Sequence, residues 1–99
     1  MNDQNIGFLL DLEKIIQERI SQDTDESYTA QLARAGDKRV AQKVGEEAVE
    51  LVQASVAGDR EEQIDESADL IYHLIVLSTL KRISVDDIVC RLRERHRPA

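Results

Sequence analysis

The chain has 99 residues, of which 41% are hydrophobic and 33% charged, and its formal net charge is −7. This length fits one domain, residues 1–99, and the composition is typical of a folded helical protein and not of a disordered one. The negative charge argues against nucleic-acid binding through phosphate neutralisation. No apolar run reaches the ~18 residues of a transmembrane span, so no membrane association is expected. The single cysteine, Cys90, excludes an intrachain disulfide and is consistent with a cytoplasmic protein.

Apolar spacing and helix-terminal residues predict five helices and no strand. The first helix is expected from about Asp3 to Ile20, followed by a polar loop, SQDTDE. A short second helix is expected to begin after an N-cap at Ser27 and to end at Ala35, where Gly36 stops it.

The third and fourth helices are expected to form an antiparallel hairpin. The third begins at Asp37 and ends before Gly58, and Asp59 caps a long fourth helix that reaches about Ile83. Because so few residues join them, the two helices are expected to fold back side by side. The hairpin is therefore the predicted centre of the bundle.

The second half of the fourth helix is apolar on all sides. Two opposite faces carry its apolar residues, Ile64, Ala68, Ile71, Leu74 and Ile75 on one and Leu70, Val76, Leu77 and Leu80 on the other. Such a helix must be covered all round, and four other helices can hardly do this alone. We therefore expect a partner chain, most simply in a two-fold homodimer.

Ser84 is expected to cap the fifth helix, and the basic tail RLRERHRPA is expected to fray. The fold class predicted from these five elements is an all-α helical bundle.

Four carboxylates lie at matched heights in the hairpin. Glu50 and Glu66 are each eight residues from Gly58, and Glu47 and Asp69 are each eleven residues from it. With a rise of about 1.5 Å per residue, each acid faces a counterpart on the neighbouring helix. The acids also border apolar positions, so mutual repulsion has to be relieved by protonation or by a divalent cation.

An all-oxygen ligand set without cysteine favours Mg²⁺, with Mn²⁺ as the second choice. A di-iron site is the rival, but that pattern needs Glu-x-x-His, whereas Asp69 and His73 are four residues apart. The simpler alternative is that these acids only form solvated helix faces. His73 and Tyr72 are expected to be packing residues.

Basic residues accompany the acids on the third helix. Arg39 and Lys43 fall on the same side as Glu46 and Glu50, and Lys38 lies near the start of the helix. Either these cations pair with the glutamates, or they contact phosphate oxygens of a bound nucleotide.

Three segments resemble the phosphoribosyl-ATP pyrophosphatases of histidine biosynthesis, which belong to the all-α, MazG-like nucleotide pyrophosphatases. The segments are SYTAQL (27–32), KRVAQKVGEEAVE (38–50) and ESADLIYHLIVL (66–77). The superfamily signature EExxE followed by ExxD corresponds to Glu46, Glu47 and Glu50, then Glu66 and Asp69.

The resemblance implies Mg²⁺-dependent hydrolysis of 1-(5-phosphoribosyl)-ATP to 1-(5-phosphoribosyl)-AMP and pyrophosphate by a dimer. It assigns metal-ligand roles to four acids, Glu47, Glu50, Glu66 and Asp69. Glu46 would be a ligand or orient water, and Lys43 would contact phosphate. Some relatives are fused to a cyclohydrolase domain, and the short chain is expected to be the stand-alone form.

The expected mechanism is attack of water on the α–β phosphoanhydride. Glu46 or Glu50 could accept the proton of the water, while Lys43 and Arg39 offset charge on the departing pyrophosphate. Two alternatives stay open: a MazG-like house-cleaning enzyme acting on nucleoside triphosphates, and a non-enzymatic module whose acidic face binds a basic partner.

Overall fold

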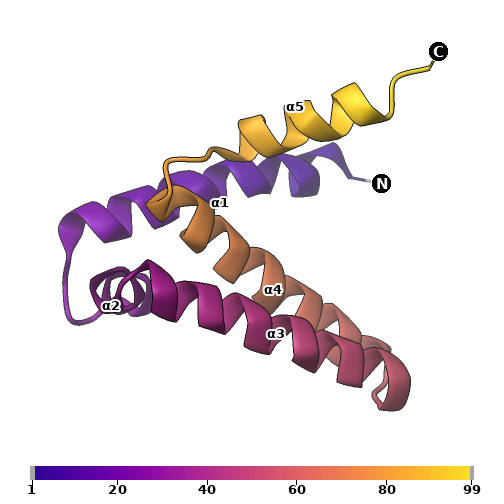
Figure 1. Ribbon diagram of the computed structural model, residues 1–99, viewed down its shortest axis with the longest axis horizontal. Helices are drawn as coiled ribbons and strands as arrows, with labels where there is room; N and C mark the ends of the chain where they lie inside the picture. Colours follow the sequence, from indigo (N-terminus) through magenta and orange to yellow (C-terminus); the bar gives the residue numbers. More distant parts are fainter. Residues whose placement is uncertain (1, 99) are drawn as a thin grey trace.

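The computed structural model describes residues 2–98, and all its regular elements are α-helices (Figure 1). The five helices are α1 (Asp3–Gln22), α2 (Tyr28–Ala35), α3 (Asp37–Ala57), α4 (Arg60–Leu80) and α5 (Val85–Arg95). The all-α prediction and the number of helices are thereby confirmed. Between residues 2 and 98, none of these helices is both long and apolar enough to cross a membrane.

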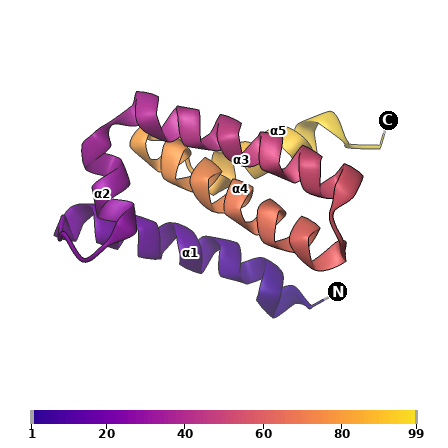
Figure 2. The ribbon, with the colours of Figure 1, turned by 90° about the horizontal axis from the view of Figure 1, so that it is seen from below.

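The predicted hairpin is the longest packed unit of the fold. Helices α3 and α4 run side by side in opposite directions, and α2 joins the N-terminal end of α3 to α1 (Figures 1 and 2). Helix α1 packs against α2 and α4, and α5 returns along α1. The hairpin therefore projects from the packed junction at one end to a free turn at the other.

That turn requires a glycine because of close approach. Gly58 has an extended backbone, and a Cβ added to it would lie 2.9 Å from the carbonyl oxygen of Ala54 and 2.6 Å from Oε2 of Glu62. The next residue, Asp59, accepts a hydrogen bond from the backbone N–H of Glu62 at 2.9 Å. This contact confirms Asp59 as the N-cap of α4.

Helix α4 ends at Leu80, three residues before the predicted end at Ile83. Arg82 adopts a left-handed conformation with φ of 59°, and the N–H of Ile83 bonds to the carbonyl of Ser78 at 2.8 Å. This is a Schellman ending. The predicted end was wrong because an arginine occupies the position where glycine normally signals such an ending.

Two other boundaries differ from the prediction. Helix α1 continues past Ile20 to Gln22, and α5 remains helical through Arg95, where fraying was expected. Ser84 and Asp87 form a reciprocal capping box at the start of α5, and the carboxylate of Glu13 accepts the N–H of Val85 at 2.7 Å. These bonds satisfy the N–H groups of Val85 and Asp87 in the first turn of α5 and attach the helix to α1.

The core lies where α1, α2, α3 and α4 meet. Its buried residues are Ile16, Leu32, Val40, Ile75 and Val76. Along the hairpin, by contrast, large apolar side chains are exposed, namely Val49, Val52 and Val56 on α3 and Ile64, Ile71 and Leu74 on α4. Of the two apolar faces predicted for α4, one is thus packed within the chain, and most of the other lies open.

Candidate metal centre

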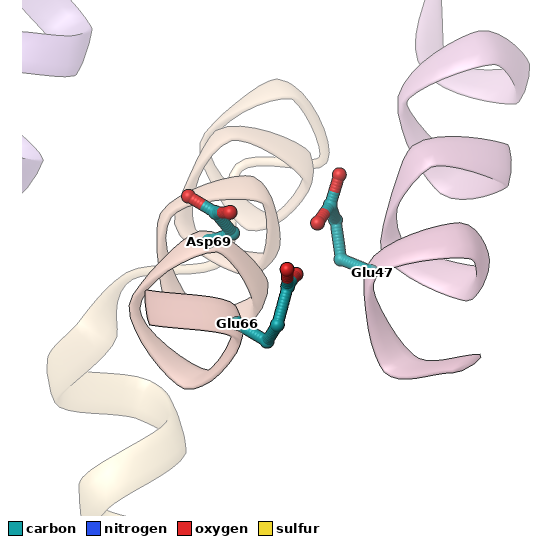
Figure 3. A group of neighbouring side chains, drawn as sticks. All are labelled: Glu47, Glu66 and Asp69. Atoms are coloured by element: carbon teal, nitrogen blue, oxygen red, sulfur yellow. The ribbon is translucent and has the colours of Figure 1, made fainter. Parts of the chain in front are cut away.

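Three carboxylates converge between the two helices of the hairpin. Glu47 reaches from α3 toward Glu66 and Asp69 of α4 (Figure 3). One oxygen of each side chain lies within 4.8 Å of an oxygen of the other two. Glu47 is buried, Glu66 is half-buried and Asp69 is exposed, so the group opens to solvent on one side.

The sequence places Glu47 in the apolar stripe of its own helix. The buried residues of α3 are Val40, Glu47 and Ala54, which follow one another at intervals of seven and so face the same direction. Packing of Val40 and Ala54 against the neighbouring helices forces Glu47 inward. On α4, Glu66 and Asp69 are separated by three residues and share a face, which the antiparallel pairing turns toward Glu47.

Two oxygens of this group are buried without a hydrogen-bond partner among the described residues. They are Oε2 of Glu47 and Oε2 of Glu66. Burying an unpaired oxygen of a charged group costs on the order of several kcal/mol of stability, unless a cation or a proton neutralises the group. Hard carboxylate oxygens within a few ångströms of one another are the ligand set that Mg²⁺ or Mn²⁺ takes in proteins, so the residues present fit such an ion.

Lys43 offsets part of the negative charge. Its Nζ lies 3.3 Å from Oε1 of Glu47 and 3.5 Å from Oε2 of Glu46. Burial alone would lower the pKa of Lys43, but the hydrogen bond that Lys43 donates to Glu47 and the nearby negative groups outweigh this effect and raise the pKa above its ordinary value. The ammonium therefore stays charged at neutral pH, beside the carboxylates.

The other predicted site residues lie farther out. Glu46 is exposed and is also paired with Arg39, whose Nη1 lies 3.5 Å from it. Glu50 is exposed and lies outside the group of three acids. Lys38 is exposed and lines a shallow depression with Lys81 at the other end of the hairpin.

The position of Glu50 has a simple geometric cause. Residues three apart on a helix differ by about 60° in direction, and Glu47 already occupies the inward direction of α3. Counting residues from the turn predicts how far along the hairpin Glu50 lies, but not the direction in which its side chain points.

The sequence reasoning passed over one neighbour of the centre, Tyr28. Its hydroxyl lies 3.0 Å from Nε2 of His73, and Nδ1 of His73 lies 2.7 Å from the backbone carbonyl oxygen of Asp69. The spacing of four residues between Asp69 and His73 predicts that both lie on one face of α4, but no local pattern indicates that Tyr28, 45 residues before His73, contacts that histidine.

Comparisons with known proteins agree with the resemblance seen in the sequence. A family model described as phosphoribosyl-ATP pyrophosphohydrolase matches residues 9–96. The chain is 50% identical over 90 residues to the histidine biosynthesis bifunctional protein HisIE of Vibrio cholerae, an alignment that covers 91% of this chain and 43% of that protein.

The same name is carried by relatives in two other bacteria. The HisIE protein of Campylobacter jejuni is 50% identical over 90 residues, which are 91% of this chain and 44% of the relative. That of Buchnera aphidicola is 45% identical over 95 residues, or 96% of this chain and 46% of the relative. The chain thus spans less than half the length of these relatives, and it belongs to the phosphoribosyl-ATP pyrophosphohydrolase family.

Proposed function

We propose that this chain hydrolyses 1-(5-phosphoribosyl)-ATP to 1-(5-phosphoribosyl)-AMP and pyrophosphate, a step of histidine biosynthesis. The family match over residues 9–96 supports the choice of substrate. The observation that carries the proposal is the pair of buried carboxylate oxygens without partners, on Glu47 and Glu66, beside Asp69. A bundle gains nothing in stability from such a group, whereas a metal-dependent phosphoanhydride hydrolase needs it.

Mg²⁺ is the proposed ion, with Mn²⁺ as the second choice. Glu47, Glu66 and Asp69 would hold it, and Glu50 is assigned an outer position from which it would act as a fourth ligand or as a base. When bound, Mg²⁺ draws charge from phosphate oxygens and lowers the pKa of a coordinated water. Its preference for a few carboxylates, with waters and substrate phosphate completing the shell, suits a group that opens to solvent on one side.

The remaining roles fall to side chains around these acids. Glu46 or Glu50 would accept the proton of the attacking water. Lys43 and Arg39 would offset charge on the departing pyrophosphate, and Lys38 would contact the substrate farther along α3. Lys43 is the best placed of the three cations, because it already lies 3.3 Å from Glu47.

The test is a panel of substrates assayed for pyrophosphate release with Mg²⁺ and with a chelator. The proposal expects release from phosphoribosyl-ATP that exceeds release from any ordinary or damaged nucleoside triphosphate and that disappears with the chelator. Preference for a triphosphate would instead identify a MazG-like house-cleaning pyrophosphatase, since the same carboxylate group serves both reactions.

A thermal-shift titration separates the enzyme from an acidic interaction module. An ion that binds only the folded chain raises its melting temperature in proportion to the logarithm of its concentration above Kd. We expect Mg²⁺ with a nucleotide to stabilise the chain. An interaction module would show neither this stabilisation nor hydrolysis.

We also propose that the chain forms a homodimer in the cytoplasm. The hairpin exposes three valines of α3 and Ile64, Ile71 and Leu74 of α4, and a groove of about 600 Å³ runs beside Ile64 and Ile71. A second copy would cover this surface. The one cysteine, Cys90, is unpaired and exposed, in keeping with a reducing compartment.

A further inference from the structure

A group of aromatic and polar side chains joins α2 to α4 at the edge of the carboxylate group. Tyr28, the first residue of α2, stacks on Tyr72 with ring centroids 6.2 Å apart, and it meets the ring of His73 edge-on at 5.9 Å. His73 is buried, while Tyr28 remains 49% exposed. The phenol is thus fixed on two sides and open on the others.

The hydrogen bonds of His73 have a defined direction. A carbonyl oxygen can only accept, so Nδ1 of His73 carries the proton that bonds to Asp69. In the neutral imidazole, Nε2 then has only a lone pair. In this neutral form the hydroxyl of Tyr28, 3.0 Å from Nε2, donates its hydrogen bond to that lone pair.

The oxygen of Tyr28 therefore offers only lone pairs to its surroundings. Burial raises the pKa of Tyr28, and the opposing charge of Lys43 does not reverse the shift, so the phenol keeps its proton at neutral pH. The hydroxyl bonds to His73, which in turn bonds to the backbone carbonyl of Asp69 one turn earlier on α4, and this places the phenol at the border of the proposed metal centre. An acceptor at that border selects for a hydrogen-bond donor on the substrate.

The chemistry of a nucleotide narrows the choice of donor. Phosphate oxygens accept hydrogen bonds at neutral pH, whereas sugar hydroxyls and the amino group of the base can donate. The ribose is attached directly to the α-phosphate, which the carboxylate-bound ion and Lys43 would hold. The base lies one unit farther away.

We propose that Tyr28 is a further substrate-contact residue whose oxygen accepts a hydrogen bond from a ribose hydroxyl, and that His73 is the positioning residue that keeps this oxygen an acceptor. The inference rests on the proposed function, because it takes the α-phosphate to lie at the carboxylates. It adds a specificity to that function: the site distinguishes ribose from deoxyribose.

The decisive variant is Tyr28→Phe, which removes the oxygen and keeps the ring stacked on Tyr72. Its kcat/KM is compared with that of the unaltered chain on phosphoribosyl-ATP and on the corresponding 2′-deoxy and 3′-deoxy adenosine compounds. The unaltered chain is expected to prefer the ribose form over one deoxy form by about tenfold. Tyr28→Phe should lose about tenfold on the ribose form and nothing on that deoxy form.

Tyr72→Phe is the matched control, since its hydroxyl meets Thr29 in the same group. It should change the ribose and deoxy substrates by the same factor. His73→Gln should reduce the ribose preference as Tyr28→Phe does and leave the Mg²⁺ dependence unchanged, provided that its circular dichroism shows a folded chain.

Equal losses on all three substrates in Tyr28→Phe, or no loss at all, would overturn the ribose contact. So would a loss confined to substrates that carry the amino group of the base, tested with the inosine counterpart. Failure of the proposed function is seen separately, in the unaltered chain. If that chain releases pyrophosphate only from ordinary triphosphates, the same variants are compared on the ribose and deoxy forms of the triphosphate.

Discussion

At the scale of single residues, Glu47 is the position on which the proposed chemistry depends most. Glu47→Gln keeps the size of the side chain and removes its charge. Because the change also relieves repulsion from Glu66 and Asp69, the variant should melt no lower than the unaltered chain. Its turnover should fall at least about 100-fold. Steady-state assays and thermal melts of the same preparation check both expectations, and unchanged activity would remove Glu47 from the site.

Glu50 lies one turn beyond Glu47 and supplies the matched comparison, since it is exposed and outside the group of three acids. Glu50→Gln separates its two proposed roles. If Glu50 acts as the base, kcat falls and the Mg²⁺ concentration for half-maximal activity stays constant. If Glu50 is a ligand, that concentration rises.

At the scale of secondary-structure elements, the turn between α3 and α4 sets the register of the carboxylates. Gly58→Ala would bring a methyl group within 2.9 Å of the Ala54 carbonyl oxygen, and backbone crowding of this kind costs about 1–3 kcal/mol. In a domain of this size, each kcal/mol lowers the melting temperature by roughly 4–8 °C. We expect a loss of that size in thermal unfolding.

Gly7→Ala in α1 is the control for this substitution, because nothing lies within 4 Å of a Cβ added there. Alanine is the better helix former by about 0.5–1 kcal/mol, so Gly7→Ala should raise the melting temperature. Shifts of the same sign in the two variants would contradict the assignment of Gly58 to close approach.

These elements also show what could be read from the sequence. The starts of α2, α4 and α5 were predictable, since Ser27, Asp59 and Ser84 are capping residues with side chains that bond to the first turn. The end of α4 was not, because Arg82 takes the left-handed conformation without a glycine.

Some features of the candidate site could likewise be predicted from the sequence, and others could not. Spacing predicted that Glu47 and Asp69 would meet across the hairpin. The direction of Glu50 follows from its rotation of about 60° relative to Glu47, which counting heights from the turn ignores. The contact of Tyr28 with His73 across 45 residues depends on tertiary packing that no local pattern encodes.

At the scale of the whole molecule, the exposed apolar surface on the hairpin predicts self-association. Ile71 is 43% exposed on α4, and Ile71→Glu would place a charge in the proposed interface, where an unpaired buried charge is strongly unfavourable. Sedimentation velocity should show a dimer for the unaltered chain and a monomer for Ile71→Glu.

Val89→Glu, on α5, is the control, since Val89 is 42% exposed and lies away from the hairpin. It should leave the dimer intact. A monomeric unaltered chain, or dissociation by Val89→Glu alone, would show that the hairpin face is not the interface.

The hairpin has a consequence for the order in which the chain folds. Contacts between neighbours in sequence form early on the folding pathway, so α3 and α4 would come together before α1 and α5 dock on them. The three acids would then repel one another already in the transition state, and an ion that relieves this repulsion would lower the barrier to folding. In stopped-flow refolding, Mg²⁺ should therefore increase the folding rate. If the ion bound only to the native state, it would instead slow unfolding and leave the folding rate unchanged.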